Sequence, residues 1–289
     1  MNTGGDIVIH AFTTKTRNQA ATVQRLMKDV ATALSAIIEV DKGVSEPSRI
    51  ALQGLQMEWR DIVDAFQTLV WNTRELAGEA QAIASDFLRV WLSRLDDTTV
   101  ALDIKMIELR DYTKDYADHA SKPKAIEMSL KGILQRITEV EGKLSSVSVP
   151  KDTVNRLLLC IKEIRRHIYG RDLIVNGFED KGLHSLLCHV TKPLPQCLKD
   201  DVSGQPLHTL PPTLANNLLA VSSISMAIRT DLLRLSQSMD ARRDDLLLDS
   251  GNLTDLRRGL DGTEALYEGL VKALYDYQVS VVPQTPSHV

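Results

Sequence analysis

The chain has 289 residues, of which 43% are hydrophobic and 25% charged, and 34 basic against 38 acidic side chains give a formal net charge of −4. This composition excludes a wholly disordered chain, and the mild negative charge disfavours nucleic acid as a partner. Aromatic residues are only 4% of the chain, which argues against a β-sandwich or barrel and favours an all-α protein.

No targeting or membrane-spanning segment is evident. No run of about 18 apolar residues occurs, and the segment before Ile7 has no basic region. The three cysteines are odd in number and follow no disulfide framework, which is typical of free thiols in a reducing compartment. We therefore expect a cytoplasmic protein, or one released without a signal peptide.

The first helix is expected at about 16–41, after an N-terminal extension over 1–15. Its apolar residues repeat at helical spacing and would form one buried stripe: Val23, Leu26, Met27, Val30, Leu34 and Ile37.

The strongest pattern lies between Pro47 and Asp97, where apolar residues alternate at spacings of three and four with Thr73 as the one polar exception. The stripe comprises Leu52, Leu55, Trp59, Ile62, Phe66, Leu69, Thr73, Leu76, Ala80, Ile83, Phe87 and Val90. A 3/4 alternation predicts one long helix with a coiled-coil-like stripe, beginning near Ser45 as a plausible N-cap.

A third position in each heptad of this helix is also apolar, namely Val63, Val70, Ala77, Ala84 and Trp91. Such a wide stripe suits a multi-helix bundle better than a two-stranded zipper. About fifty residues at about 1.5 Å each give a helix of about 75 Å, so the sequence predicts an elongated shape.

Three further helices follow. One is expected at about 98–120, capped at Asp97 or Thr98 or continuous with the long helix. The next carries a regular stripe comprising Ile126, Leu130, Ile133, Ile137, Val140 and Leu144. A fifth carries Leu157, Ile161, Ile164 and Ile168 and ends at Gly170. We expect the longest hairpin to pair about 46–95 with 99–146.

An irregular insert at about 171–211 contains several prolines and glycines that a long helix cannot cross. The helical stripe then returns over 214–239, and a final helix is expected before a flexible tail at 281–289. The fold class is therefore an all-α, elongated antiparallel helical bundle, with one domain over 16–280.

Three features are candidate membrane or partner contacts. Trp71 lies on the outward face of the long helix, where packing against another helix of the chain is the favoured interpretation and a contact surface the alternative. Lys162, Arg165 and Arg166 form a basic helix end, which the helix dipole explains and which an anionic lipid could also use. The most apolar stretch contains Leu218, Leu219, Val221, Ile224 and Ile228 and reads as a buried helix that a rearrangement could release.

The sequence offers few candidate residues for catalysis or cofactor binding. His184, Cys188, His189 and Cys197 could hold zinc, but no Cys-x-x-Cys pair is present, so packed thiols and surface histidines are the favoured interpretation. No P-loop, dinucleotide fingerprint, HExxH or GxSxG occurs. We expect no enzyme and no cofactor.

Two functions remain open. The first is a non-catalytic bundle that acts through protein–protein assembly, with itself or another helical protein. The second is a soluble protein that rearranges to bind or enter membrane lipid. The layout of long helices with an insert beside an apolar stretch is similar to that of the helical cytolysins of the haemolysin-BL type. That resemblance implies pore formation, although this insert carries charges such as Glu179, Asp180 and Lys181 in place of an apolar hairpin.

Overall fold

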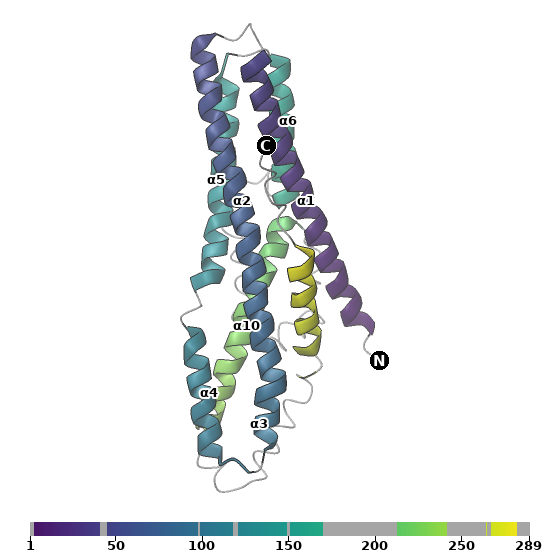
Figure 1. The fold of residues 1–289 in the computed structure, drawn as a ribbon, viewed down its shortest axis with the longest axis vertical. Coiled ribbons are helices and arrows are strands. Elements are labelled where there is room, and N and C mark those ends of the chain that lie inside the picture. Colours follow the sequence, from purple (N-terminus) through teal and green to yellow (C-terminus); the bar gives the residue numbers. More distant parts are fainter. Residues whose placement is uncertain are drawn as a thin grey trace, which may run out of the picture.

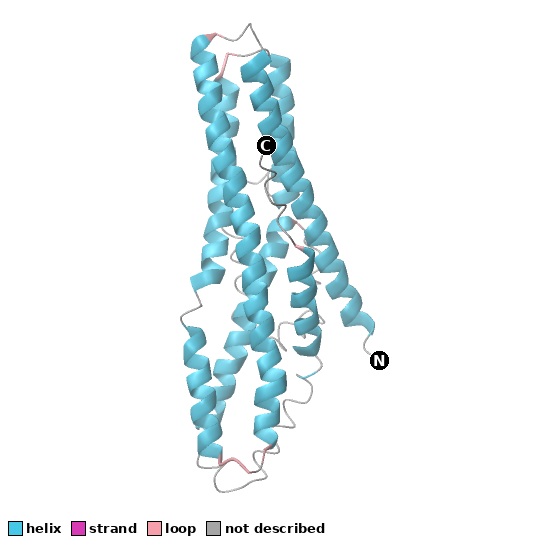
Figure 2. Cartoon of the chain, in the orientation of Figure 1, coloured by secondary structure: helices cyan, strands magenta, loops and turns pink. Residues whose placement is uncertain are grey.

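The computed structural model describes residues 3–40, 45–97, 99–117, 121–148, 151–169, 213–241, 264 and 267–281. These residues are almost entirely helical and include no strand (Figure 2). The all-α prediction is confirmed. The expected insert at 171–211, the four candidate zinc ligands within it and nearly all of the expected tail lie outside the described residues.

The helices pack lengthwise into a rod (Figure 1). In chain order they are α1 (Thr3–Val40), α2 (Glu46–Asp86), a π-helical turn η1 (Phe87–Trp91), α3 (Leu92–Asp96), α4 (Leu102–Ala117), α5 (Ser121–Ser146), α6 (Lys151–Tyr169) and α10 (Leu214–Ala241). A last helical segment covers 267–280. The first helix thus begins at Thr3, well before the expected start at about residue 16.

The long helix runs without a break from Glu46 to Asp96 through α2, η1 and α3. Ser45 takes the N-cap position with an extended backbone, but its hydroxyl contacts the Ser48 hydroxyl and makes no capping bond. Every predicted stripe residue from Leu52 to Phe87 is buried. Thr73 is tolerated in the core because its hydroxyl donates to the carbonyl of Val70 and accepts from the Tyr277 hydroxyl, 3.0 Å away.

The predicted stripe fails at Val90, which is 51% exposed. The cause is η1, whose wider turn adds a residue and rotates the helix, so that Trp91 and Leu95 are buried in place of Val90. This rotation places Phe87 against Tyr267, with ring centroids 4.6 Å apart, and Trp91 against Tyr112 at 5.2 Å.

The expected hairpin is confirmed, and its returning arm consists of two helices, α4 and α5. The chain turns between Asp96 and Leu102, and α4 and α5 run back beside α3 and α2 in succession. Ion pairs join the two arms near both ends: Arg94 with Glu108, and Glu58 with Lys143.

The rod has two groups of helices that both contact α2. In one half α1, α2, α5 and α6 pack together; in the other, α10 packs against α2 and α4, and α10 also contacts α5, α1 and α6 (Figure 1). The last segment runs antiparallel to α2, with Tyr267 near Phe87 and Tyr277 near Thr73. None of the described helices combines the length and apolar character that crossing a bilayer requires.

Candidate functional site

The outer face of α2 is the most distinctive exposed surface of the rod. This face comprises Ile50, Met57, Asp64 and Trp71. Each of them lies two positions before a residue of the buried stripe, namely Leu52, Trp59, Phe66 and Thr73. Because the buried stripe keeps its heptad register over this stretch, these four residues stay on one line facing outward. Ile50 is 61% exposed, Met57 68% and Trp71 45%.

Neighbouring helices flank this face without covering it. On the α1 side, the Trp59 indole N–H donates to the carbonyl of Met27 at 2.9 Å, and the Gln56 amide donates to the Ser35 hydroxyl. On the α5 side, Lys143 pairs with Glu58 and Arg136 with Asp61. The outer face is therefore an open strip between two packed helices.

Trp71 is held in one orientation although it is exposed. Its indole N–H donates to Glu75 Oε1 at 2.8 Å, and the Arg74 guanidinium lies 5.0 Å from the ring centroid, within the range of a cation–π contact. Arg74 is fixed in turn because its Nε donates to the carbonyl of Gln278. The favoured interpretation, that Trp71 packs beneath another helix of the chain, is not what the structure shows.

Two glycines of α2 have contrasting surroundings. A Cβ on Gly78 would lie 2.9 Å from Gln278 Oε1, so this glycine lets the last segment approach. A Cβ on Gly54 would meet nothing within 4 Å. An exposed glycine inside a helix costs about 1 kcal/mol relative to alanine, and none of the described residues packs against the one at position 54. The missing side chain leaves a gap on the exposed helix surface between Ile50 and Met57, and we call this gap the Gly54 hollow.

The basic cluster on α6 is largely neutralised inside the chain. Arg165 Nη1 lies 2.7 Å from Glu141 Oε2 of α5. Arg166 pairs with Glu163, and His167 Nε2 lies 3.1 Å from the same carboxylate. Lys162 is exposed on the same helix. The structure thus turns two of the three candidate lipid contacts toward carboxylates of their own bundle.

The apolar stretch of α10 is core. Leu218, Leu219, Val221 and Ile228 are buried, and Ile224 packs half-buried against them. These residues could meet a partner or a lipid only if α10 left its place between the other helices.

An ion pair between a buried arginine and a partly exposed glutamate also links α10 to α2. Arg229 is buried, and its Nη2 lies 3.6 Å from Glu79 Oε2 of α2, while Lys122 of α5 donates to the other oxygen of the same carboxylate. The Ser222 and Ser225 hydroxyls, buried on the same helix, find no hydrogen-bond partner among the described residues. Because losing one partner of a buried charge pair is costly, this contact specifies how α10 sits on α2.

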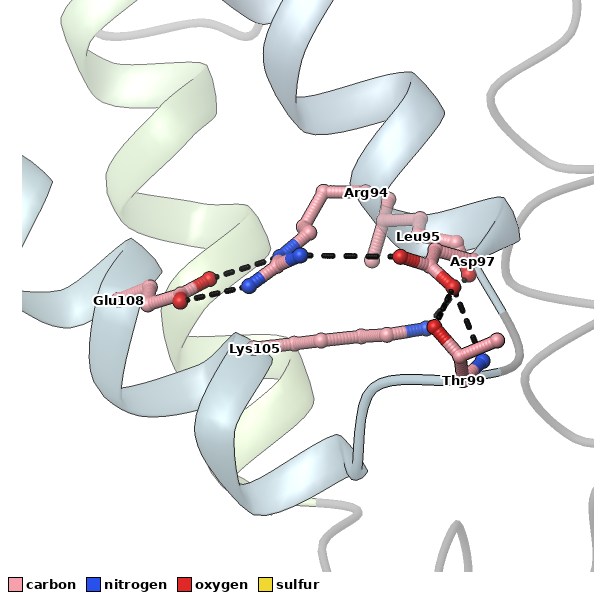
Figure 3. A network of polar contacts seen from close by, with 6 residues as sticks. All are labelled: Arg94, Leu95, Asp97, Thr99, Lys105 and Glu108. Atoms are coloured by element: carbon pink, nitrogen blue, oxygen red, sulfur yellow. Dashed lines mark hydrogen bonds and ion pairs between the residues drawn. The ribbon is translucent and has the colours of Figure 1, made fainter.

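A polar network closes the α3–α4 turn (Figure 3). Arg94 binds both carboxylate oxygens of Glu108, at 2.9 and 2.8 Å. These bonds raise the pKa of the Arg94 guanidinium and lower that of the Glu108 carboxyl. Asp97 accepts from the hydroxyl and the backbone N–H of Thr99, which lowers its pKa.

Lys105 lies at the centre of this network and is only 2% exposed. Its ammonium donates to the carbonyl of Leu95 at 3.0 Å and so satisfies an acceptor at the end of α3. Burial lowers the pKa of Lys105, and the nearby Asp97 carboxylate opposes that shift. The network ties the turn together as a structural element.

We expect Lys105→Glu to destabilise the turn strongly. It would place a buried carboxylate against the Leu95 carbonyl and beside Asp97, with a loss of about 3–5 kcal/mol in the free energy of unfolding. Lys114→Glu is the matched control, since Lys114 is exposed on the same helix and its pair with Asp111 contributes under about 1 kcal/mol. Urea denaturation measures both, and equal losses would contradict the buried role of Lys105.

No group of three His, Cys, Asp or Glu side chains in the described part of the chain could hold a metal ion. Cys160 is a free thiol, half-buried against the apolar core.

Fold and site together define an elongated all-α bundle whose outer α2 face carries exposed apolar side chains. No protein-family model, curated protein or solved structure matches the chain.

Proposed function

We propose that this chain is a non-catalytic helical-bundle protein that acts through protein–protein assembly, either with itself or with another helical protein. One observation carries the proposal: Ile50, Met57 and Trp71 stand exposed along one line of α2. Large apolar residues scattered singly over a surface need no explanation, but an aligned set marks a contact surface. Tryptophan is among the residues that contribute most to binding at such surfaces.

The rigidity of this face supports the proposal further. Glu75 and Arg74 hold Trp71 in place before any partner arrives, so little side-chain entropy is lost on binding. The packed helices α1 and α5 flank the strip on either side, and within it the exposed Asp64 separates Met57 from Trp71.

Photocrosslinking in the full chain tests the proposal. A photoreactive residue at exposed Thr68, one turn from Trp71, is expected to give a product of defined mass in extract of cells that express the chain. The same group at Glu139, exposed on α5, is the control. The Thr68 product should disappear when Trp71→Glu is added. Absence of any product that depends on Trp71 would overturn assembly through this face.

A second candidate function is a soluble bundle that binds or rearranges into membrane lipid. The observation that favours it is the group of three exposed aliphatic residues near the α3–α4 turn, namely Val90, Ile104 and Ile107. Side chains of this kind at the end of a rod could enter the headgroup region of a bilayer. Leakage of dye from liposomes on adding the chain would support this function, and intact liposomes without bound protein would contradict it.

A further inference from the structure

We infer that the outer face of α2 binds the same face of a second copy of this chain, antiparallel, with Trp71 of each copy in the hollow over Gly54 of the other. The inference rests on the proposed function and names the partner that the face fits. Four residues surround the hollow: Ile50, Gln53, Gly54 and Met57. They are spaced i, i+3, i+4 and i+7, the arrangement that receives one side chain from a facing helix.

The hollow and the side chain that would fill it belong to the same helix. Gly54 leaves open space between two exposed aliphatic side chains. Trp71 projects from the same line and is held by its neighbours in the sequence. In a two-fold symmetric dimer every contact occurs twice, so the contact of Trp71 with the Gly54 hollow forms on both sides of the axis.

Charge complementarity supports the second copy as the occupant. If Trp71 of one copy lies over Gly54 of the other, the two-fold axis passes midway between these positions, near residue 62. Facing residues then lie at equal distances on either side of residue 62, so their numbers sum to about 124. Arg60 of one copy consequently faces Asp64 of the other, and the reverse holds on the far side of the axis. Asp61, the other acidic residue near the axis, is paired with Arg136 of its own chain. Opposite charges thus meet in this antiparallel register, whereas an in-register parallel pairing would place Arg60 opposite Arg60 and Asp64 opposite Asp64.

The last segment of the chain approaches this surface at one end of the strip. Farther along α2, the last segment runs antiparallel to it, and Gln278 lies against Gly78 on the same outer line. That segment also bonds to Arg74, which lies on the Trp71 ring. The last segment packs on the buried stripe through Tyr267 and Tyr277, and Gln278 reaches the outer line at Gly78, just beyond the end of the open strip from Ile50 to Trp71.

The test is sedimentation of the purified full chain over a wide concentration range. We expect a reversible dimer. Gly54→Leu fills the hollow while replacing an exposed helical glycine, so it should raise the melting temperature and yet weaken dimerisation more than about tenfold. Gly142→Leu is the matched control, because a Cβ on Gly142 of α5 also meets nothing within 4 Å; it should leave dimerisation unchanged.

A charge exchange tests the orientation. Arg60→Asp should weaken the dimer by placing like charges opposite each other, and Arg60→Asp with Asp64→Arg should restore it. A chain that sediments as a monomer at every concentration overturns the inference. A dimer whose affinity is unchanged by Gly54→Leu, or is not restored by the charge exchange, also overturns it. A Thr68 crosslink to a different protein would also overturn it while leaving the proposed function standing. Absence of every crosslink would overturn both.

Discussion

Phe66→Asp is expected to unfold the bundle at room temperature. Phe66 is fully buried in the middle of the α2 stripe, so the substitution removes an aromatic ring from the core and leaves an ionised carboxylate in its place. Loss of a buried phenylalanine side chain alone costs about 3–5 kcal/mol. The unpaired charge adds further cost, and the sum approaches the whole stability of a typical protein, about 5–15 kcal/mol.

Ala82→Asp is the matched control for this substitution. It introduces the same charge into the same helix, but Ala82 is exposed, so the loss should stay below about 1 kcal/mol. Circular dichroism on heating and in urea measures both variants. A Phe66→Asp chain that melts like Ala82→Asp would show that α2 does not bury this stripe.

Raising the pH above about 10 is expected to unfold the chain steeply. Tyr169, Tyr267 and Tyr277 are buried, and burial raises the pKa of each hydroxyl above its ordinary value; the Asp231 carboxylate adds to the shift for Tyr267. Above the ordinary value the unfolded chain releases protons that the folded chain retains, so stability falls as pH rises. Each tyrosine contributes about 1.4 kcal/mol per pH unit, or about 4 for all three.

The titration of Lys105 has the opposite effect on the pH dependence of stability. Its pKa is lowered in the folded chain, so between that lowered value and its ordinary value the unfolded chain binds more protons and stability rises with pH. One lysine offsets only part of the effect of three tyrosines.

The alkaline transition is measured by urea denaturation at successive pH values together with tyrosinate absorbance. A chain with Tyr169→Phe and Tyr277→Phe should lose about two thirds of the slope, about 3 kcal/mol per pH unit. If the three buried tyrosines ionised before the helices melted, their burial would be contradicted.

The regular part of the fold could be predicted because α2 and α5 repeat apolar residues without interruption. Leu52 through Phe87 and Ile126 through Leu144 are buried as the pattern indicates. Such spacing reports one helix face directly, and any bundle that covers this face satisfies it.

The exceptions depend on contacts between distant parts of the chain. Val90 is exposed because η1 changes the register, and η1 is accompanied by the contact of Phe87 with Tyr267, which lies far along the sequence. Lys105 carries a charge that favours exposure, yet it lies beside the apolar residues Leu102 and Leu109 and is buried against the end of α3. Arg74 joins Trp71 to the last segment, a contact between residues about 200 positions apart that the local sequence does not indicate.

The candidate site was foreseen only in part. Trp71 stood out as an outward aromatic residue, whereas the hollow at Gly54 acquired meaning once its surroundings were known to be empty. The basic end of α6 and the apolar residues of α10 were plausible contacts from their composition. Their carboxylate partners and burial come from α5, α6 and α2, which the local sequence does not identify.

The sharing of α2 by both halves of the rod has a consequence for cooperativity. Helices at either end cannot separate from α2 without exposing part of its apolar stripe, and that stripe is continuous from Leu52 to Phe87. Local unfolding at one end therefore exposes part of the α2 surface and destabilises the packing of the helices at the other end. Because α10 also contacts α1, α5 and α6, it adds a second connection between the two ends, and we expect the whole rod to unfold as one cooperative unit.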